Sequence, residues 1–481
     1  MKSDQGIWAG RYLPVTLANL TIIAIAAFDG LAIVAALPSI TKDLGDVALV
    51  PWVITAYLAT SAVAVIVAGP VIDAIGVRRT FRVTGVWFLV WSGAAAAAPS
   101  MQALIAIRVM QGLGGGLVIA VALASVGLAY PHELRPRAFT ANSLVWGGMG
   151  FGGPAVAAAL LTLGDWRSIF LFQLPLTALA LAVGWRSLPS TRDRPTRVRI
   201  DWAGVALLSV VTLASLIAVS EIGVRWWLAG VGVAVTGIAA SAYWAHSGRI
   251  ADPVLHREHL TRLPLRWVHL TSGLVLMAGL AADNYLPLYV QTTRGRSEGL
   301  AAFSLVFLTV GWTVGSVVFS RVLKFWRESD VILLGSTTVT PALALATLAI
   351  AFDWPLAVVF AGFGLIGVSI GFVSTAGLTL LQASSSQSEM GRTNAAHQFI
   401  RTLCITYGVA LGGAILLLVV DRRVGDTDSV RDVLAGEDVE LGAETAGAIG
   451  AGLAWTSLLT VGVGILCFIA ALRLKSATRR A

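Results

Sequence analysis

Residues 101–129 read MQALIAIRVMQGLGGGLVIAVALASVGLA, a run in which Arg108 is the one charged side chain. A helix needs about 20 mainly apolar residues to cross the hydrocarbon core of a bilayer, because its backbone groups must bond to one another where water is absent. The run is longer than this minimum. It therefore predicts a membrane-spanning helix that carries a single charge in its interior.

The composition of the whole chain indicates a protein whose main solvent is lipid. Of its 481 residues, 57% are hydrophobic and 12% are charged, whereas a soluble domain carries about 25% charged residues. This excludes a large soluble enzyme. The net charge of +8 would suggest nucleic-acid binding in a soluble protein. Here basic residues in the loops between spans account for it, so no nucleic-acid partner is expected.

The sequence does not group the residues that a disulfide framework, a metal site or an enzyme active site would need. Cys404 and Cys467 both lie in apolar runs, so no disulfide framework is expected. We find no metal-ligand spacing, no nucleophile with a neighbouring base and no phosphate-binding loop. The sequence therefore predicts neither an enzyme nor a metal or cofactor site.

Fourteen apolar runs are long enough to span a bilayer. They lie near residues 13–38, 49–71, 80–98, 101–129, 139–162, 168–187, 202–222, 225–245, 266–290, 299–322, 330–351, 355–381, 392–420 and 446–473. An even number places both termini on one side of the membrane. If that side is the cytoplasm, 24 of the 34 Lys and Arg residues lie inside, eight lie outside, and Arg108 and Arg401 lie within spans. This is the bias that the positive-inside rule predicts.

The spans predict three parts of an all-α membrane protein. Residues 1–188 form an N-terminal bundle of six helices, residues 189–265 hold cytoplasmic linkers and two additional helices, and residues 266–481 form a C-terminal six-helix bundle. An acidic loop at residues 421–445 is expected outside the cell. Arginine greatly outnumbers lysine, which hints at a high-GC bacterium, and hence at its inner (cytoplasmic) membrane.

Four charged residues stand out in the interior of the predicted spans, where charge is costly and usually functional. They are Asp29, Arg108, Asp283 and Arg401. If they face one cavity, they could neutralise each other or bind and release protons, since burial and nearby charges shift the pKa of a carboxyl in opposite directions. A static buried ion pair is the alternative, especially for Arg108. No fixed partner is evident for Asp29.

The thirteenth span carries a polar stripe. Asn394, Gln398 and Arg401 follow the i, i+4, i+7 spacing of one helix face, which points to an aqueous cavity or to another helix. His397, one position away, is more often a satisfied hydrogen-bond donor than a proton carrier.

Four segments of the first half carry recognisable patterns. Residues 28–38 read FDGLAIVAALP, residues 69–79 read GPVIDAIGVRR, residues 108–112 read RVMQG and residues 148–158 read GMGFGGPAVAA. In this order and at these spans, they resemble motifs of the major facilitator superfamily, specifically its fourteen-span drug:proton antiporter branch. Leu31, Val34, Ala74 and Val77 depart from the residues that the family favours.

The resemblance implies a role for each segment. It implies proton coupling by Asp29 and Arg108. Asp283 is a further candidate for proton coupling, because it is a second carboxyl inside a span. It implies that the loop at 69–79, here named the gating loop, locks the outward-open state. The motif residues are Gly69, Asp73, Gly76, Arg78 and Arg79 in the gating loop, Arg108, Gln111 and Gly112 in the fourth span, and Gly148, Gly152, Gly153 and Pro154 in the antiporter motif. Generic packing of small residues is the alternative for the last motif.

Family architecture further implies two six-helix bundles around a midplane cavity. The candidate cavity residues are Tyr57, Trp146, Asn284, Tyr285, Gln398 and Arg401. The leading hypothesis is an exporter of amphipathic or cationic small molecules, such as drugs or toxic metabolites, driven by the proton motive force without a cofactor. Its partners would be a lipophilic cargo, protons and membrane lipids, and the protein would be a monomer.

Two alternatives remain open. The first is a lipid or glycolipid transporter on the same scaffold, which the two additional helices permit. The second is a non-transporting membrane partner or receptor. Asp29 and Arg108 argue against the latter, because such a protein would not need charges within its spans.

Overall fold

The fold comes from a computed structural model, which describes residues 6–46, 49–190, 199–222, 225–323, 325–425, 430 and 442–480. Every regular element in these residues is helical, and no strand occurs among them. The predicted all-α membrane fold is thus confirmed. Most of the acidic loop at 421–445 and the centre of the linker that begins at residue 189 lie outside the described residues.

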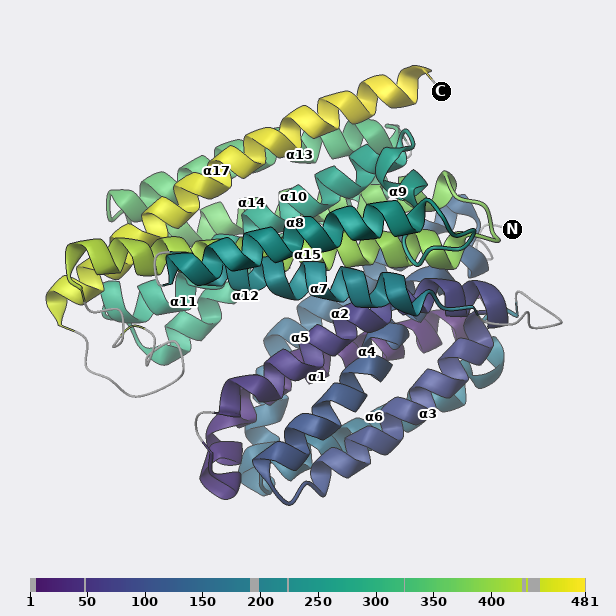
Figure 1. Ribbon diagram of the computed structural model, residues 1–481, viewed down its shortest axis with the longest axis horizontal. Coiled ribbons are helices and arrows are strands. Elements are labelled where there is room, and N and C mark those ends of the chain that lie inside the picture. The colour runs from purple at the N-terminus through teal and green to yellow at the C-terminus, as the bar shows by residue number, and fades with distance from the viewer. Residues whose placement is uncertain are drawn as a thin grey trace. The chain divides into compact units, whose positions relative to one another are not determined.

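All fourteen predicted spans are helical (Figure 1). The first eight are α1 (Leu13–Leu44), α2 (Val50–Ile75), α3 (Val77–Ala96), α4 (Met101–Ala129), α5 (Arg135–Leu163), α6 (Arg167–Ser187), α7 (Trp202–Ser220) and α8 (Trp226–Ser247). The last six begin with α10 (Leu265–Asp283), and continue with α12 (Glu298–Val322), α13 (Glu328–Ala351), α14 (Leu356–Ala383), α15 (Met390–Arg423) and α17 (Ala443–Arg480). The short helices η2 (His132–Leu134) and α9 (Arg257–Thr261) lie in connections.

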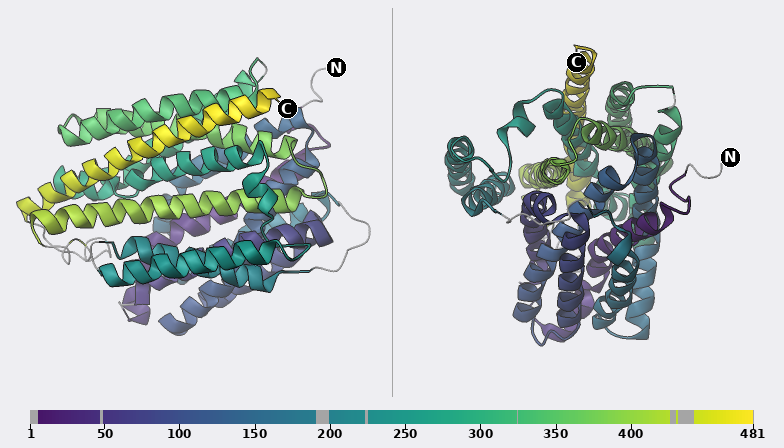
Figure 2. Two further views of the ribbon diagram at one scale, coloured as in Figure 1. Left: turned by 45° about the horizontal axis from the view of Figure 1, so that its top comes forward. Right: turned by 90° about the vertical axis from the view of Figure 1, so that its right-hand side faces the viewer.

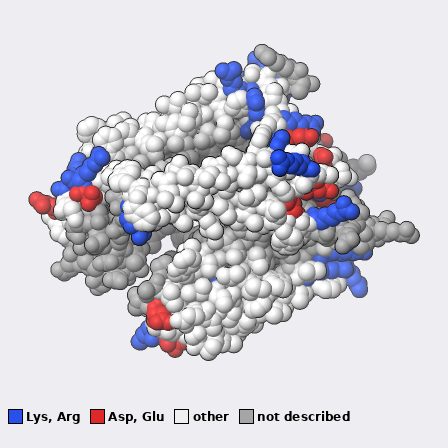
Figure 3. Space-filling view, in the orientation of Figure 1, with Lys and Arg blue, Asp and Glu red and all other residues white. Residues whose placement is uncertain are grey.

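Not all of these helices meet the length and hydropathy that crossing a membrane requires. Twelve of those described are long and apolar enough to cross a membrane, and α5 makes a thirteenth if its two bent halves count as one span. The remaining helix, α3, carries Arg78, Arg79 and Arg82 in its first six residues. On the face shown in Figure 3, charged side chains gather near helix ends and the flanks between them are largely uncharged.

The ninth span is broken, which the sequence pattern does not predict. Helix α10 ends at Asp283, the short helix α11 (Leu286–Leu288) follows, and a π-helical turn, η3 (Tyr289–Thr293), completes the span. Pro287 in α11 lacks the N–H that a continuous helix would use. π-helical turns within helices are frequent at functional sites.

The chain forms two compact units. The first unit contains residues 1–205, 252–255 and 381–399, and the second contains residues 206–251, 256–380 and 400–481. The boundaries expected at residues 188 and 265 stay a prediction. In the first unit α2 packs on α4, α1 packs on α5 and α6, and α3 packs on α4 and α6. In the second unit α17 packs on α10 and α13, and α13 and α17 run side by side in Figures 1 and 2.

Glycines set the closest helix approaches in both units. In the first unit, Gly112 and Gly116 of α4 lie against the carbonyls of Tyr57 and Ser61 in α2. In the second unit, glycines of α12 and α14 approach the opposite backbone equally closely, among them Gly311, Gly315, Gly367 and Gly371. Small residues of this kind let backbones meet where lipid offers no hydrophobic drive for helix association.

Within the second unit, a polar contact joins the additional pair of helices to α15. Gly232 of α8 lies against Ala214 and Ala218 of α7, so the two helices form a closely packed hairpin. Ser215 of α7 and Tyr407 of α15 share a hydrogen bond of 2.5 Å between their hydroxyl oxygens. Most of the α8 surface is exposed, as expected for a helix that faces lipid.

At the far end of α1 from the N-terminus, beyond the apolar part of the span, Asp43 joins α1 to α6. Trp166 Nε1 and Arg167 Nη1 donate to Asp43 Oδ2 at 3.0 and 2.7 Å. These hydrogen bonds, first that of Trp166 and then that of Arg167, hold the pKa of Asp43 below its ordinary value of 3.8. The carboxylate therefore stays ionised at neutral pH and keeps both contacts.

Replacing Gly112 by Ala should destabilise the protein, because a Cβ there would lie 2.5 Å from the Tyr57 carbonyl oxygen. Overpacking of this kind costs about 1–3 kcal/mol, which exceeds the ~1 kcal/mol that Ala gains over Gly in a helix. Gly148→Ala is the matched control, since nothing lies within 4 Å of its Cβ position. Thermal unfolding of the purified variants should show a lower melting temperature for Gly112→Ala alone. Equal melting temperatures would contradict the close approach of α2 and α4.

Candidate functional site

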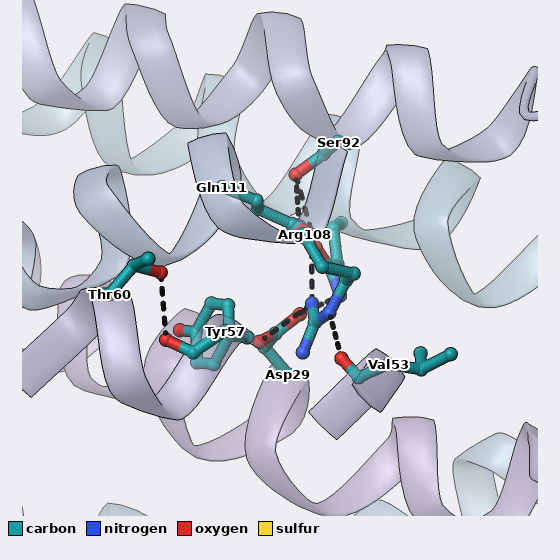
Figure 4. Close-up of polar contacts among 8 residues, drawn as sticks. Asp29, Val53, Tyr57, Thr60, Ser92, Arg108 and Gln111 are labelled. Carbon is teal, nitrogen blue, oxygen red and sulfur yellow. Dashed lines mark hydrogen bonds and ion pairs between the residues drawn. The ribbon is translucent and has the colours of Figure 1, made fainter. Parts of the chain in front are cut away.

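A buried ion pair occupies the interior of the first unit (Figure 4). Arg108 Nη1 in α4 lies 2.9 Å from Asp29 Oδ1 and 3.2 Å from Asp29 Oδ2 in α1. The two side chains are 1% and 0% exposed. Asp29 therefore has a fixed partner, and the expectation that it has none is wrong. The alternative of a static pair for Arg108 agrees with this arrangement.

Polar side chains from neighbouring helices complete the pair. Gln173 Nε2 of α6 donates to Asp29 Oδ1 at 2.8 Å, and Arg108 Nη1 donates to Gln111 Oε1, also at 2.8 Å. Gln111 Nε2 donates in turn to Ser92 Oγ and to Gln173 Oε1, both at 2.9 Å. We name Asp29, Ser92, Arg108, Gln111 and Gln173 the charge cluster. Because its members bind one another, the desolvated charges have the hydrogen bonds that burial demands.

Helix α2 closes the guanidinium side of the charge cluster. Arg108 Nε donates to the Val53 carbonyl at 3.1 Å. The guanidinium lies over the Tyr57 ring, with its carbon 4.1 Å from the ring centroid, a cation–π contact worth about 2 kcal/mol when desolvated. Gly115 allows this placement, since a Cβ there would clash with the Tyr57 hydroxyl. Tyr57, predicted as a cavity residue, thus supports Arg108 in this structure.

The sequence identifies only part of the charge cluster. Asp29, Arg108 and Gln111 are predicted, whereas Gln173, Ser92 and the Val53 carbonyl are not. Gln173 was detectable in principle, because it is a long amide within the apolar run of the sixth span. Ser92 and a backbone carbonyl give no such signal, since serine is common in membrane helices and bonds locally.

The gating loop binds the start of α15 within the first unit. Asp73 Oδ1 accepts from the Gly391 amide at 2.9 Å, and Asp73 Oδ2 accepts from the Arg392 amide at 3.1 Å. The Arg392 guanidinium lies 3.8 Å from Asp73 and 3.3 Å from Asp252. First-turn amides of a helix have no partner within the helix, and a carboxylate there also meets the positive end of the helix dipole.

Glycines make this contact between the gating loop and α15 possible. A Cβ at Gly69 would lie 2.8 Å from the Arg392 Cα, and one at Gly391 would lie 2.5 Å from Asp73 Oδ1. Gly76 separates α2 from α3 with a φ of +84°, which non-glycine residues rarely adopt. Elsewhere in the loop, Arg78 Nε donates to the Leu188 carbonyl at 2.6 Å, while Arg79 is exposed.

The antiporter motif lies at a bend of α5. The axis turns by 47° between residues 132–150 and 155–163, and Gly148 and Gly152 have no atom within 4 Å of their Cβ positions. Tight packing of small residues therefore does not explain these two glycines. Gly153 is buried, and the side chain of Pro154 lies outside what the structure describes.

The second unit holds the other two interior charges, and it does not pair them. Asp283 at the end of α10 is 7% exposed and its Oδ1 has no hydrogen-bond partner. Arg401 in α15 is 8% exposed and its Nε likewise has none. Among the described residues, the structure gives neither side chain an ion pair. Of the four interior charges, Asp29 and Arg108 alone form an ion pair among the described residues.

The predicted cavity residues divide between the two units. Tyr57, Trp146 and Gln398 belong to the first, whereas Asn284, Tyr285 and Arg401 belong to the second. Trp146 and Asn284 are exposed, and Gln398 is half-buried. The Tyr285 hydroxyl donates to the Val409 carbonyl at 2.8 Å, which ties the broken span to α15. Their convergence on one cavity stays a prediction.

Removing one member of the buried pair should cost more than removing both. Asp29→Asn leaves the Arg108 charge uncompensated and Arg108→Gln does the same to Asp29, at about 3–5 kcal/mol each. The double variant buries no charge. We expect its melting temperature to lie well above the value that two additive losses would give.

The cycle is measured by thermal unfolding of the four purified proteins in one detergent. Additive losses of melting temperature would show that Asp29 and Arg108 do not interact, and would contradict the ion pair.

Replacing Asp73 by Ala should expose the first amides of α15. Asp73 provides their hydrogen bonds, and bonds to a charged acceptor contribute about 1.5–3 kcal/mol each, so amide exchange near Gly391 should accelerate about tenfold or more. Hydrogen–deuterium exchange with mass spectrometry measures this on peptides that cover residues 386–396. Arg79→Ala, in the same loop but exposed, should leave those peptides unchanged. Unchanged amide exchange in Asp73→Ala would refute the hydrogen bonds from the first amides of α15 to Asp73.

Comparison with known proteins agrees with this architecture. A model of the Major Facilitator Superfamily matches residues 20–409. A probable multidrug-efflux transporter of Mycobacterium tuberculosis is 27% identical over 430 residues, which cover 86% of this chain and 90% of the relative. The multidrug transporter protein MdtP of Bacillus subtilis is 24% identical over 440 residues, with 89% and 80% covered.

A solved structure extends the comparison to the fold. The human organic anion transporter MFSD10 superposes with a TM-score of 0.67 at 14% sequence identity, over 95% of this chain and 99% of that one. At this identity the likeness shows the fold alone. The fourteen helical spans are consistent with the fourteen-span branch. With its family match over most of its length, the chain belongs to the major facilitator superfamily of membrane transporters.

Proposed function

We propose that this protein is a proton-coupled exporter of amphipathic or cationic small molecules, such as drugs or toxic metabolites, that works by alternating access. The names of the relatives from Mycobacterium tuberculosis and Bacillus subtilis, both multidrug transporters, support a drug-like cargo. The observation that carries the proposal is the interior position of two carboxyl groups, Asp29 and Asp283, in helices that hold almost no other charge. Such groups can exchange protons as cargo moves in the opposite direction.

The two carboxyl groups contribute differently in this proposal. Among the described residues Asp283 has no basic partner, so a negative charge on it is uncompensated until cargo or a proton arrives. Asp29 is compensated by Arg108, so a proton that reaches it releases the guanidinium and loosens α1 from α4. The charge cluster then acts as a switch between the helices of the first unit. The proton motive force supplies the energy, and no cofactor takes part.

The gating loop and the membrane orientation complete the proposal. The contact of Asp73 with α15 closes one end of the transport path, and its release opens that end. The excess of basic residues on one side favours cytoplasmic termini. The protein would act as a monomer in the inner (cytoplasmic) membrane, with protons, lipophilic cargo and lipids as its partners.

Transport by the purified full chain in liposomes tests the proposal. With an imposed acidic lumen, the wild type should accumulate ethidium, and a protonophore should abolish the accumulation. Asp283→Asn and the neutral double variant Asp29→Asn/Arg108→Gln should accumulate at least tenfold less, because neither can exchange a proton at the altered site. Both should still exchange ethidium down its own gradient.

Asp330→Asn is the matched control, because this aspartate lies at a helix end and pairs with Lys475 at 3.0 Å. It should accumulate ethidium like the wild type. Ethidium movement that ignores the proton gradient would refute proton coupling. A gradient-driven movement of a fluorescent phosphatidylglycerol, with none of ethidium, would favour the lipid transporter instead.

A further inference from the structure

Arg401 is a buried charge that has no ion-pair partner among the described residues. It lies in α15, with 8% of the residue exposed, and its Nε has no hydrogen-bond partner. Within the described part of the chain, its guanidinium forms no ion pair. Arg108, the other interior arginine, is by contrast bound to Asp29, Gln111 and the Val53 carbonyl.

The packing of α10 on α15 keeps Asp283 away from Arg401. Gly273 lies against Cys404, Gly408 against Met277 and Gly412 against Ala281. The contacts advance by four residues on both helices, so the helices run parallel in a fixed register, in which Arg401 is level with residue 270. Asp283 lies thirteen residues further along α10, a distance of about 20 Å at 1.5 Å per residue.

Four further described carboxylates of the second unit do not compensate Arg401. Glu221, Asp330 and Asp353 lie at helix ends or in loops, where they pair with Arg225, Lys475 and Arg294, respectively. Asp421 is on the same helix as Arg401, but twenty residues further along and thus about 30 Å away. No ion pair joins Arg401 to a carboxylate among the residues that the structure describes.

Arginine does not remove this charge by losing a proton, because its guanidinium stays protonated near neutral pH. A buried charge without a partner is costly. The guanidinium also presents a planar set of donors that matches a carboxylate or phosphate with two parallel hydrogen bonds. An oxyanion from outside the chain would supply what the protein lacks at this position.

We propose that Arg401 binds an anionic group of the cargo, a carboxylate or a similar oxyanion. This inference rests on the proposed export function and narrows its substrate class to amphiphiles that carry a negative charge, alone or beside a positive one. Asp283, at a different depth of the same unit, has the opposite preference. The same oxyanion chemistry is present in the headgroup of an anionic lipid, and the experiment separates the two sources.

Competition against ethidium transport in liposomes tests the proposal with three eight-carbon probes that share one chain length. Octanoate, octylamine and octanol differ in charge. In phosphatidylcholine liposomes, octanoate should inhibit the wild type at about tenfold lower concentration than it inhibits Arg401→Gln. Octanol should inhibit both proteins alike. Arg401→Lys should keep part of the octanoate sensitivity, because it keeps the positive charge but loses the planar set of guanidinium donors.

Controls keep the outcomes distinct. Arg422→Gln removes an exposed arginine from the end of the same helix and should behave as the wild type. Equal octanoate sensitivity of the wild type and Arg401→Gln would overturn the proposal, even if ethidium is exported. If phosphatidylglycerol in the liposomes abolishes the octanoate effect, the anion is a lipid and the cargo assignment is wrong. Failure of ethidium transport in the wild type would instead refute the proposed function itself.

Discussion

The cost of holding charge inside a membrane protein governs this structure. Almost every buried side chain is uncharged, so each charged exception must be compensated or must have a use. In the first unit, the two buried charges of the charge cluster compensate each other. Asp29 and Arg108 lie 2.9 Å apart, and glutamine, serine and a backbone carbonyl satisfy the groups that the ion pair leaves over. Breaking such a network leaves several buried polar groups unsatisfied at once.

The need to give each polar group a partner also applies where helices begin. The first amides of α15 have no partner within their own helix, and Asp73 of the gating loop supplies one. The contact requires Gly69 and Gly391, because side chains there would separate the two backbones. A single carboxylate thus joins segments more than 300 residues apart in sequence. Two charge-assisted hydrogen bonds and the helix dipole stabilise this contact between Asp73 and α15. The contact can therefore form or break without repacking of a hydrophobic core.

Hydropathy predicts the spans of this chain well, because a run of about 20 apolar residues rarely serves any purpose except crossing a bilayer. It predicts the contacts between spans poorly. Asp29 and Arg108 are 79 residues apart, and nothing local indicates that they meet. Gln173 joins them from a third helix. The break after Asp283 is also invisible to a hydropathy window, since the residues on both sides of it remain apolar. Motif resemblance identified Arg108 and Asp73, but only the structure gives their partners.

The difference between the two units has a physical consequence for coupling. In the proposed cycle, breaking the ion pair of Asp29 with Arg108 goes together with a movement of α1 against α4. An unpaired carboxyl such as Asp283 needs no such movement. Arg401 differs from both, because it keeps its charge in every state and can be compensated only by an anion or by water. In the transport cycle that we propose, the first unit holds a closed ion pair, whereas the second unit holds the open charges on which a charged group of the cargo acts.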